Sequence, residues 1–335
     1  MVRFGIIGTN FISREFVSTG STLPGFSVSA VYSRAMDTAR AFAGDSGAAC
    51  LTSLDELAAR DDVDAVYIAS PNLFHAPQAE QMLRAGKHVL LEKPACPDSE
   101  TFQRLCRLAR EQGVVLLEAM RSVFTPGFAA LRQAVREIGP VRQVSFLYCQ
   151  YSSRYDKLKA GIVENAFNPA LCNGALMDIG VYCVHALVEL FGPPESVVSL
   201  AHRLESGIDV QGGALCRYPS MLAGLSWSKI ADGRRQNEIQ GEEATLVADS
   251  ITNPKEILRI GRDGSRRVVY HDPDPEFFGM AHEIAAFLSF ASAAPGAGRP
   301  WEAHNQVTRQ SLALMDEIRR QTGIDFIQYT PQKGE

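Results

Sequence analysis

The sequence lacks the features that would place it in several specialised classes of protein. Its 33 Lys and Arg residues are outnumbered by 38 Asp and Glu residues, so no excess of positive charge indicates nucleic acid binding. No uninterrupted apolar run approaches the ~20 residues that a membrane-spanning helix needs. The amino terminus, Met1 to Phe4, leads directly into a predicted strand without a signal-peptide pattern. We therefore expect neither nucleic acid nor membrane partners.

The seven cysteines are too few and too irregularly spaced for a cysteine-based framework. They form no Cys-x-x-Cys pair, and their odd number disfavours a set of disulfides or a thiolate zinc site. We expect reduced thiols that act mostly as small buried apolar side chains, in a cytoplasmic protein that holds no metal.

What is present is typical of a two-domain globular protein. The chain of 335 residues is long for one ordinary domain, and 46% of its residues are hydrophobic, which is enough for a sizeable core. Strand and helix patterns alternate through about residue 120, which predicts a doubly wound parallel sheet with helices on both faces. Residues 1–122 are therefore predicted to form a first domain of the α/β class.

The pattern changes in residues 123–335, which we assign to a second domain of the α+β type. Strand-like runs separated by turn signals predict a large, mainly antiparallel sheet. The predicted strands are residues 141–152, 196–205, 208–218, 221–230, 235–248 and 257–270. Helices near residues 279–293 and 302–321 are expected to close the chain.

A glycine turn follows the first predicted strand, residues 2–7. The segment from Gly8 to Ser13 leads into a helix, and such a turn presents backbone N–H groups and the positive end of the helix dipole to a pyrophosphate. Only Gly8 matches the Gly-x-Gly-x-x-Gly pattern, while Asn10 and Ser13 stand at the other two glycine positions. Asn tolerates a left-handed backbone and Ser is small enough for close helix packing, so a dinucleotide site stays open.

The end of the second predicted strand favours NADP over NAD. A carboxylate there would bind the adenine ribose, but the sequence offers Ser33 and Arg34, with no acid before Asp37. A hydroxyl beside a guanidinium suits a 2′-phosphate better than a bare 2′-hydroxyl. The other interpretation is an ordinary surface arginine, because the separation of Arg34 from Gly8 exceeds the usual ~20 residues.

Polar residues follow two more of the buried strands. Residues 89–91 lead into Glu92-Lys93-Pro94, and residues 65–69 lead into Ser70-Pro71-Asn72 and then His75. Ligands of open parallel sheets bind outside the carboxyl ends of the strands, and a cis X-Pro bond would fix the direction of Lys93. Alternatively, Glu92 and Lys93 form an ordinary solvated turn.

A further polar group lies in residues 173–185, which are otherwise apolar. If the segment is α-helical from about residue 175, Asp178 and Tyr182 share one face, with His185 a turn further along it. A carboxylate beside a phenol, with Lys93 nearby, would form a proton relay, because an adjacent ammonium lowers the pKa of a phenol from its usual ~10. We interpret His185 as a core histidine, and its spacing from Asp178 and Cys183 disfavours a metal site.

These motifs together resemble the glucose-fructose oxidoreductase, inositol dehydrogenase and MocA family of NAD(P)-dependent oxidoreductases. The resemblance extends over nearly the whole length of the chain. It rests on the Gly8 turn and on residues 70–75, 85–89, 92–94, 118–120 and 178–182. It implies a Rossmann domain followed by a substrate-binding domain whose open sheet forms the interface of a homodimer or homotetramer.

The resemblance also implies roles for individual residues. Lys93 would lie beside the nicotinamide and the substrate, and Asp178 and Tyr182 would complete the catalytic group. Inositol dehydrogenases carry a histidine at the position of Tyr182. With a tyrosine there, the chain more closely resembles the dihydrodiol and xylose dehydrogenase branch of the family, which uses NADP. The sequence departs from the family at Asn10, and from the Trp-Thr-Arg-Phe stretch of that branch at Arg121 and Val123.

We therefore predict hydride transfer between NADP, or NAD, and a carbinol or carbonyl carbon of a sugar, polyol or diol. The predicted substrate-binding residues are Lys93, Arg154, Tyr155, Asn168, Asn173, Asp178 and Tyr182. The predicted cofactor-binding residues are Gly8, Thr9, Asn10, Phe11, Ile12, Ser33, Arg34, Ser70, Pro71, Asn72, His75, Glu92, Lys93 and Arg121. The residues between 152 and 173 are equally well interpreted as a solvated loop.

Two other functions remain open on the sequence. One is a regulator or sensor that holds NADP without chemistry, although such a protein has no need of a proton relay. The other is a reductase of a non-sugar substrate, of the imine or tetrapyrrole type, built on the same two-domain plan.

Overall fold

The computed structural model describes residues 1–274, 279–293 and 298–326, and its contacts divide the chain into two compact units. The first unit comprises Met1–Arg121 and Phe278–Arg309, and the second comprises Ser122–Phe277 and Gln310–Glu335. The first boundary lies one residue before the predicted one. The contacts group residues 278–309 with the first unit, whereas the sequence analysis assigned everything after residue 122 to the second domain.

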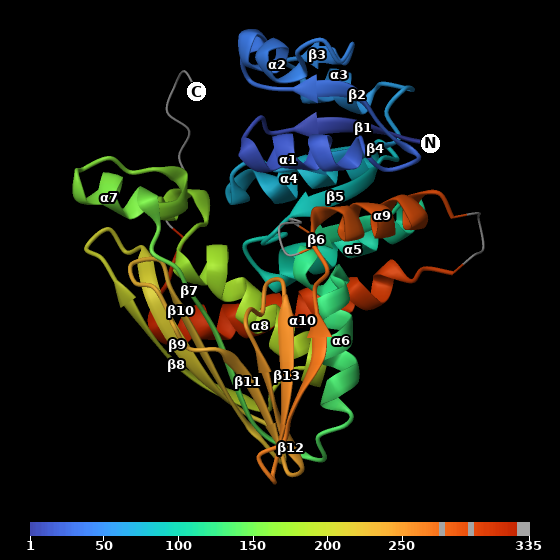
Figure 1. The fold of residues 1–335 in the computed structure, drawn as a ribbon. Coiled ribbons are helices and arrows are strands. Elements are labelled where there is room, and N and C mark those ends of the chain that lie inside the picture. The colour runs from blue at the N-terminus through green and yellow to red at the C-terminus, as the bar shows by residue number, and fades with distance from the viewer. Residues whose placement is uncertain (275–278, 294–297, 327–335) are drawn as a thin grey trace. The chain divides into compact units, whose positions relative to one another are not determined.

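The first unit is built on a six-stranded sheet in the order β3-β2-β1-β4-β5-β6 (Figure 1). Its strands are β1 (Val2–Ile7), β2 (Phe26–Tyr32), β3 (Ala49–Leu51), β4 (Ala65–Ile68), β5 (His88–Glu92) and β6 (Leu116–Ala119). Every neighbouring pair is parallel, and the order reverses between β1 and β4, so the predicted doubly wound sheet is confirmed. The sequence analysis did not predict β3, because three residues are too few to show a pattern.

Helices cover the first sheet, and several begin at the caps that the sequence provides. They are α1 (Phe11–Gly20), α2 (Met36–Ala43), α3 (Leu54–Ala58), α4 (Asn72–Arg84), α5 (Ser99–Gln112), α9 (Met280–Ala291) and the first turns of α10 (Trp301–Thr322). The side chains of Asn10, Ser53 and Asp98 accept a backbone N–H at the starts of α1, α3 and α5. These helices pack through an aromatic core in which Phe16 stacks on Tyr67, with ring centroids 3.8 Å apart.

The second unit is built on an eight-stranded sheet in the order β14-β13-β12-β11-β7-β10-β9-β8. Its strands are β7 (Val141–Cys149), β8 (Ser196–Arg203), β9 (Asp209–Arg217), β10 (Leu222–Ser228), β11 (Asn237–Gly241), β12 (Ala244–Ala248), β13 (Glu256–Gly261) and β14 (Arg266–His271). The sheet is mainly antiparallel, as predicted, although β7 and β10 pair in parallel. The predicted runs 235–248 and 257–270 are each a hairpin rather than one strand. The predicted strand 141–152 ends at Cys149, because Ser152 caps α7 (Ser153–Lys159).

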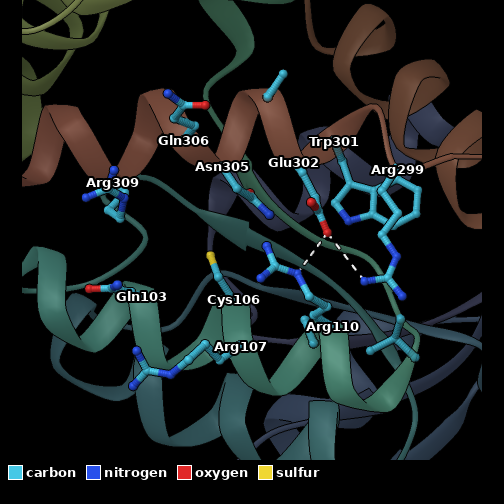
Figure 2. A pocket seen from close by; sticks show the side chains of 13 residues that line it. Gln103, Cys106, Arg107, Arg110, Arg299, Trp301, Glu302, Asn305, Gln306 and Arg309 are labelled. Carbon is cyan, nitrogen blue, oxygen red and sulfur yellow. Dashed lines mark hydrogen bonds and ion pairs between the residues drawn. The ribbon is translucent and has the colours of Figure 1, made fainter.

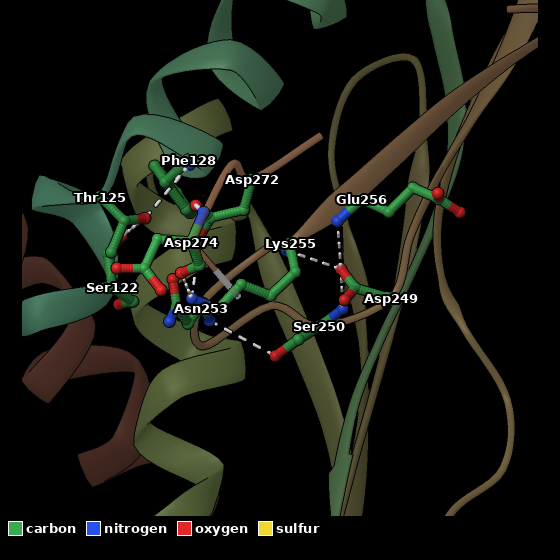
Figure 3. A network of polar contacts seen from close by, with 10 residues as sticks. All are labelled: Ser122, Thr125, Phe128, Asp249, Ser250, Asn253, Lys255, Glu256, Asp272 and Asp274. Atoms are coloured by element: carbon green, nitrogen blue, oxygen red, sulfur yellow. Dashed lines mark hydrogen bonds and ion pairs between the residues drawn. The ribbon is translucent and has the colours of Figure 1, made fainter. Parts of the chain in front are cut away.

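A polar network joins the ends of the outer strands of this sheet (Figure 3). Asp249, just after β12, accepts the backbone N–H groups of Ser250, Lys255 and Glu256 at 2.9–3.1 Å. The Lys255 ammonium donates to Asp272, just after β14, at 2.8 Å, and this contact lowers the pKa of Asp272. The network fixes the loop between β12 and β13 through backbone hydrogen bonds.

Besides α7, the second unit contains α6 (Pro126–Val135), α8 (Val181–Phe191) and the part of α10 from Gln310 onward. Short helices lie at Asn165–Phe167, Pro169–Leu171 and Leu176–Gly180, and another, Arg121–Phe124, begins at the boundary between the units. α8 packs on β7 and β10, and α6 packs on β13 and β14. The segment Pro169–Phe191 could span a membrane by length and composition alone, but 78% of its most apolar stretch is buried within the fold. It is the core helix of this unit, since every residue of α8 from Val181 to Val188 is buried.

The opposite face of the second sheet exposes apolar residues. Strand register places the following partners in one row, and hence on one face: Val268, Leu258, Val247, Glu238, Ser145, Gly224, Leu215 and Val198. On this face Val198 is 71% exposed, Leu200 81% and Leu215 53%. Their alternating neighbours are buried against the helices.

Candidate active site

Four strand ends of the first sheet lie side by side. β1, β4, β5 and β6 are consecutive in the sheet and run parallel, so their carboxyl ends share one edge. This edge gathers the Gly8 turn, Ser70, Lys93 and Arg121, each of which the sequence analysis singled out. It lies at the point where the strand order reverses, which is where open α/β sheets bind ligands.

The turn after β1 depends on Gly8 and not on a left-handed Asn10. Gly8 has φ +99°, and a Cβ atom there would lie 2.6 Å from the carbonyl oxygen of Ala69. Asn10 has φ −84°, so it does not use the left-handed conformation that asparagine tolerates. Its side chain folds back, donating to the Ala69 carbonyl at 2.7 Å and accepting the N–H of Ser13 at 3.1 Å. Ser13 is fully buried, as its small size predicted.

The start of α1 fits an anionic group such as a pyrophosphate. Asn10 caps only the N–H of Ser13, and within the described residues the N–H groups of Phe11 and Ile12 donate no hydrogen bond. Phe11 is 63% exposed, so this end of the helix faces solvent. Free N–H groups at a helix start bind phosphate oxygens. The departure from glycine at position 10 therefore leaves the anion site intact.

The end of β2 presents an available guanidinium. The backbone N–H of Ser33 donates to Leu51 of β3 at 3.1 Å, which fixes the chain where it leaves the sheet. Arg34 is exposed, and its side chain forms no ion pair or hydrogen bond with any described residue. It can therefore bind a phosphate at this end of β2.

His75 contacts the protein itself on both ring nitrogens. It is 1% exposed, with Nδ1 3.0 Å from the Pro94 carbonyl oxygen and Nε2 2.8 Å from that of Ser70. Burial lowers the pKa of His75 to about 4, so the ring is neutral at pH 7. His75 connects the chain after β4 to the Lys93–Pro94 peptide after β5, which is cis. It positions Ser70 and Pro94.

Glu92, just before Lys93, is buried and does not form the solvated turn that was the alternative interpretation. It is 8% exposed and accepts the Tyr67 hydroxyl at 2.6 Å and the Lys93 N–H at 3.1 Å. Burial raises the pKa of Glu92, and the charges of Lys93 and Arg121 oppose that rise. These hydrogen bonds hold the Glu92 side chain and the backbone of Lys93 in place at the end of β5.

Two more buried carboxyl groups, Glu118 and Glu283, interact electrostatically with the charged groups near the end of β5. Glu118, at 3% exposure, accepts the Ala95 N–H at 2.8 Å and the Thr308 hydroxyl at 2.9 Å. Glu283 of α9 is 1% exposed, and burial together with the neighbouring Glu92 raises its pKa well above the usual value. Sequence analysis missed Glu283, because nothing in a helix so far along the chain indicates its neighbours.

The buried Glu118 predicts a pH-dependent stability. Burial raises the pKa of Glu118 from 4.5 to about 7, so the folded protein binds this proton more tightly than the unfolded chain does. The stabilisation is complete below pH 4.5 and is lost as the pH rises through about 7. Thermal unfolding of Glu118→Gln and wild type from pH 4.5 to 8 should therefore show the wild type losing stability relative to the variant. Parallel curves would contradict the assignment.

The helix that carries Asp178 and Tyr182 begins as a π-helix, which corrects the α-helix predicted from about residue 175. Residues Leu176–Gly180 close hydrogen bonds from i to i+5, and α8 starts only at Val181. The four-residue spacing of Asp178 and Tyr182 therefore does not by itself place them on one α-helical face. Their contacts decide where they lie.

Asp178 forms an ion pair with a lysine that the sequence analysis missed. Its Oδ2 lies 2.6 Å from the Nζ of Lys229, which follows β10. The Lys229 side chain is 3% exposed, donates to the Ala166 carbonyl at 3.1 Å and lies over the Phe167 ring at 4.7 Å. A lysine directly after a buried strand was the available signal, as it was for Lys93.

Tyr182 lies at the same edge of the second sheet. It is 7% exposed and packs edge-on against Tyr148 of β7, with ring centroids 5.7 Å apart. β7 and β10 are parallel neighbours, so Tyr148 and Lys229 mark one pair of carboxyl ends. The structure thus directs Asp178 and Tyr182 toward the same strand ends. His185 is 2% exposed, as expected of a core histidine.

A buried aspartate holds the start of the π-helix. Asp209 of β9 is fully buried and accepts the N–H of Leu176 at 2.7 Å. A Cβ atom at Gly174 would lie 1.9 Å from Asp209 Oδ1, so only glycine fits there. Burial raises the pKa of Asp209 to about 6. No local pattern indicated this role, because Asp209 lies 33 residues from its partner.

The predicted substrate-binding loop contains α7 and short helical turns, and its polar residues have partners in the loop itself. Arg154 lies 3.3 Å from Glu164, and the Tyr155 ring packs on Phe167. Asn168 accepts the N–H of Ala170 and Asn173 accepts the N–H of Gly174, both at 3.0 Å. These contacts give each residue a structural role, and a role in substrate binding stays a prediction.

Across residues 1–274, 279–293 and 298–326, no cluster of three His, Cys, Asp or Glu side chains could hold a metal ion. All seven cysteines are free thiols.

Two family models match this chain. Residues 2–120 match the model described as an oxidoreductase family with an NAD-binding Rossmann fold, and residues 128–247 match the GFO/IDH/MocA C-terminal domain. The chain belongs to this family of oxidoreductases. Residues 2–120 match the NAD-binding Rossmann fold of these oxidoreductases, as the resemblance implied.

Family relatives cover nearly the whole chain. The scyllo-inositol 2-dehydrogenase (NADP(+)) IolU of Bacillus subtilis is 40% identical over 97% of this chain and 98% of its own length. The trans-1,2-dihydrobenzene-1,2-diol dehydrogenase of Mus musculus is 30% identical over 77% of each. The solved structure of KijD10, a 3-ketoreductase from Actinomadura kijaniata with NADP and TDP-benzene, superposes with a TM-score of 0.84. It is 26% identical over 98% of this chain and 99% of its own.

Proposed function

We propose that the protein transfers a hydride reversibly between NADP and a carbinol or carbonyl carbon of a sugar, polyol or diol. The observation that carries the proposal is Lys93, fixed at the carboxyl end of β5 among buried carboxyl groups. Relatives named for scyllo-inositol, a dihydrodiol and a keto sugar support the substrate class. Steady-state turnover of NADP(H) on such substrates tests the proposal.

The bound nicotinamide dinucleotide would supply or accept the hydride. The N–H groups of Phe11 and Ile12 would bind its pyrophosphate at the start of α1, and Arg34 would bind the 2′-phosphate. Two more polar residues would contribute to the cofactor site at this edge of the sheet. They are Ser70, whose hydroxyl donates to Gln78 at 2.6 Å, and Asn72 at the start of α4.

We propose Lys93, Asp178 and Tyr182 as the catalytic residues. In the reduction direction, an alkoxide develops on the substrate oxygen, and the Lys93 ammonium would stabilise its charge. The Tyr182 hydroxyl would deliver the proton and would take it back in the oxidation direction. Asp178, kept beside the Lys229 ammonium, would accept hydrogen bonds from substrate hydroxyls.

The exposed apolar face of the second sheet supports a homo-oligomer. Val198, Leu200 and Leu215 expose large apolar side chains in adjacent positions of β8 and β9, as surfaces that become buried in assemblies do. We propose that residues 1–122 bind the cofactor and residues 123–335 bind substrate and form this interface. Seven free thiols support a reducing compartment such as the cytoplasm.

The Arg34→Ala variant tests the cofactor preference. Loss of a charged hydrogen bond to the 2′-phosphate costs about 1.5–3 kcal/mol, so KM for NADP should rise roughly tenfold or more while KM for NAD is unchanged. Arg40→Ala, at another exposed arginine of the same unit, is the matched control and should leave both constants unchanged. Equal effects of Arg34→Ala on the two cofactors would refute the assignment.

A further inference from the structure

The first unit contains a pocket between α5 and α10. It lies between the C-terminal half of α5 and the first turns of α10 and encloses about 580 Å³ (Figure 2). α5 runs from the carboxyl edge of the sheet, after β5, toward the amino edge, before β6. Val114, which precedes β6, lines the pocket, so the pocket extends toward the amino edge. It is therefore separate from the strand ends proposed to bind the cofactor.

The pocket carries an excess of positive charge. Arg107 and Arg110 of α5 line it together with Arg299 and Arg309, and the carboxylate of Glu302 opposes them. Glu302 lies 3.2 Å from Arg110 and 3.4 Å from Arg299, and these contacts lower its pKa. Arg107 and Arg309 form no ion pair or hydrogen bond with any described residue. A concave site with unneutralised guanidinium groups concentrates anions.

Asn305 adds a second and independent indication of a ligand. It lines the pocket and is 8% exposed, and its Nδ2 donates to the Leu116 carbonyl at 2.9 Å. That bond orients the amide, and the buried Oδ1 atom has no hydrogen-bond partner in the described chain. A buried acceptor without a partner is costly, so a donor from a ligand is expected there. Cations alone would attract any anion, whereas Asn305 selects one that carries a hydroxyl or amino group.

We infer that this pocket binds a small phosphate ester that also carries a hydroxyl group. Arg107 and Arg309 would bind the phosphate, because the guanidinium fork matches two phosphate oxygens. Asn305 Oδ1 would accept the ligand hydroxyl. Arg110, Glu302 and Arg299 form the wall that keeps the pocket open.

Tryptophan fluorescence gives a local readout. Trp301 lines the pocket, and the other tryptophan, Trp227, is 1% exposed in the core of the second unit. Glycerol 3-phosphate titrated into the full-length protein should produce a saturable change that is lost in Trp301→Phe. Inorganic phosphate, which has no carbinol hydroxyl, should bind more weakly. The titration needs no turnover, so its result is independent of the proposed reaction.

Charge variants decide where the probe binds. Arg107→Gln and Arg309→Gln should each weaken binding about tenfold or more, as expected for a lost charge-assisted hydrogen bond. Arg104→Gln is the matched control, because Arg104 lies on α5, pairs with Glu100 at 3.8 Å and does not line the pocket. Arg34→Ala tests for binding at the cofactor site instead. No saturable change, equal weakening by Arg104→Gln, or weakening by Arg34→Ala alone would each overturn the inference.

Discussion

Replacement of Lys93 by Met is expected to lower kcat about 100-fold or more while the fold is retained. The variant removes the ammonium that would stabilise the developing alkoxide, and loss of one such group costs ~10²–10³ in rate. The side chain is half-buried at the end of β5, so Met fills its space. Steady-state kinetics with NADPH and a keto sugar, or with NADP and an inositol, measure the effect.

A matched control lies at the other end of the same strand. Lys87 immediately precedes β5, and its ammonium donates to the Arg60 carbonyl at 2.6 Å. Lys87→Met should change stability slightly and leave kcat unchanged. If Lys93→Met kept kcat within a few-fold of wild type, Lys93 would not be a catalytic residue.

Replacement of Asp178 by Asn is expected to lower the free energy of unfolding by about 3 kcal/mol. The variant leaves the ammonium of Lys229, whose side chain is 3% exposed, without its counter-charge. The value lies at the low end for a broken buried ion pair, because the Asp178 side chain is itself 27% exposed. Denaturant unfolding measures the change.

The control for this variant is an exposed pair in the same unit. Asp156 pairs with Lys159 at 2.8 Å, and both side chains are more than half exposed. Asp156→Asn should leave the free energy of unfolding close to that of the wild type, since solvent screens such pairs. A loss of stability in Asp178→Asn no larger than in this control would contradict a structural role for the Lys229 pair.

Local sequence patterns were enough to predict the parallel sheet of the first unit and the residues at its carboxyl edge. The Gly8 turn, the Lys93 strand end and the Ser70 strand end all follow short apolar runs, and parallel pairing then places them at one edge. The hairpin of β11 and β12 was harder to predict. Its turn consists of two glutamates, which give no proline or asparagine signal.

What the sequence could not give depends on contacts between distant residues. Lys229 and Asp209 bind the helix of Asp178 from strands more than 30 residues away. Glu283 reaches the group around Glu92 from a helix near the end of the chain. The π-helix at Leu176–Gly180 also has no sequence signal of its own, although it changes the direction in which Asp178 points.

The measurement that tests the account most directly is steady-state turnover with NADP and NAD against inositols, aldoses, trans-diols and dicarbonyl compounds. We predict turnover of at least one of these classes, with a preference for NADP that Arg34→Ala removes and a rate that Tyr182→Phe abolishes. Cofactor binding without turnover on any of them would contradict the proposed reaction and favour an NADP-binding sensor or a reductase of imine or tetrapyrrole-type substrates.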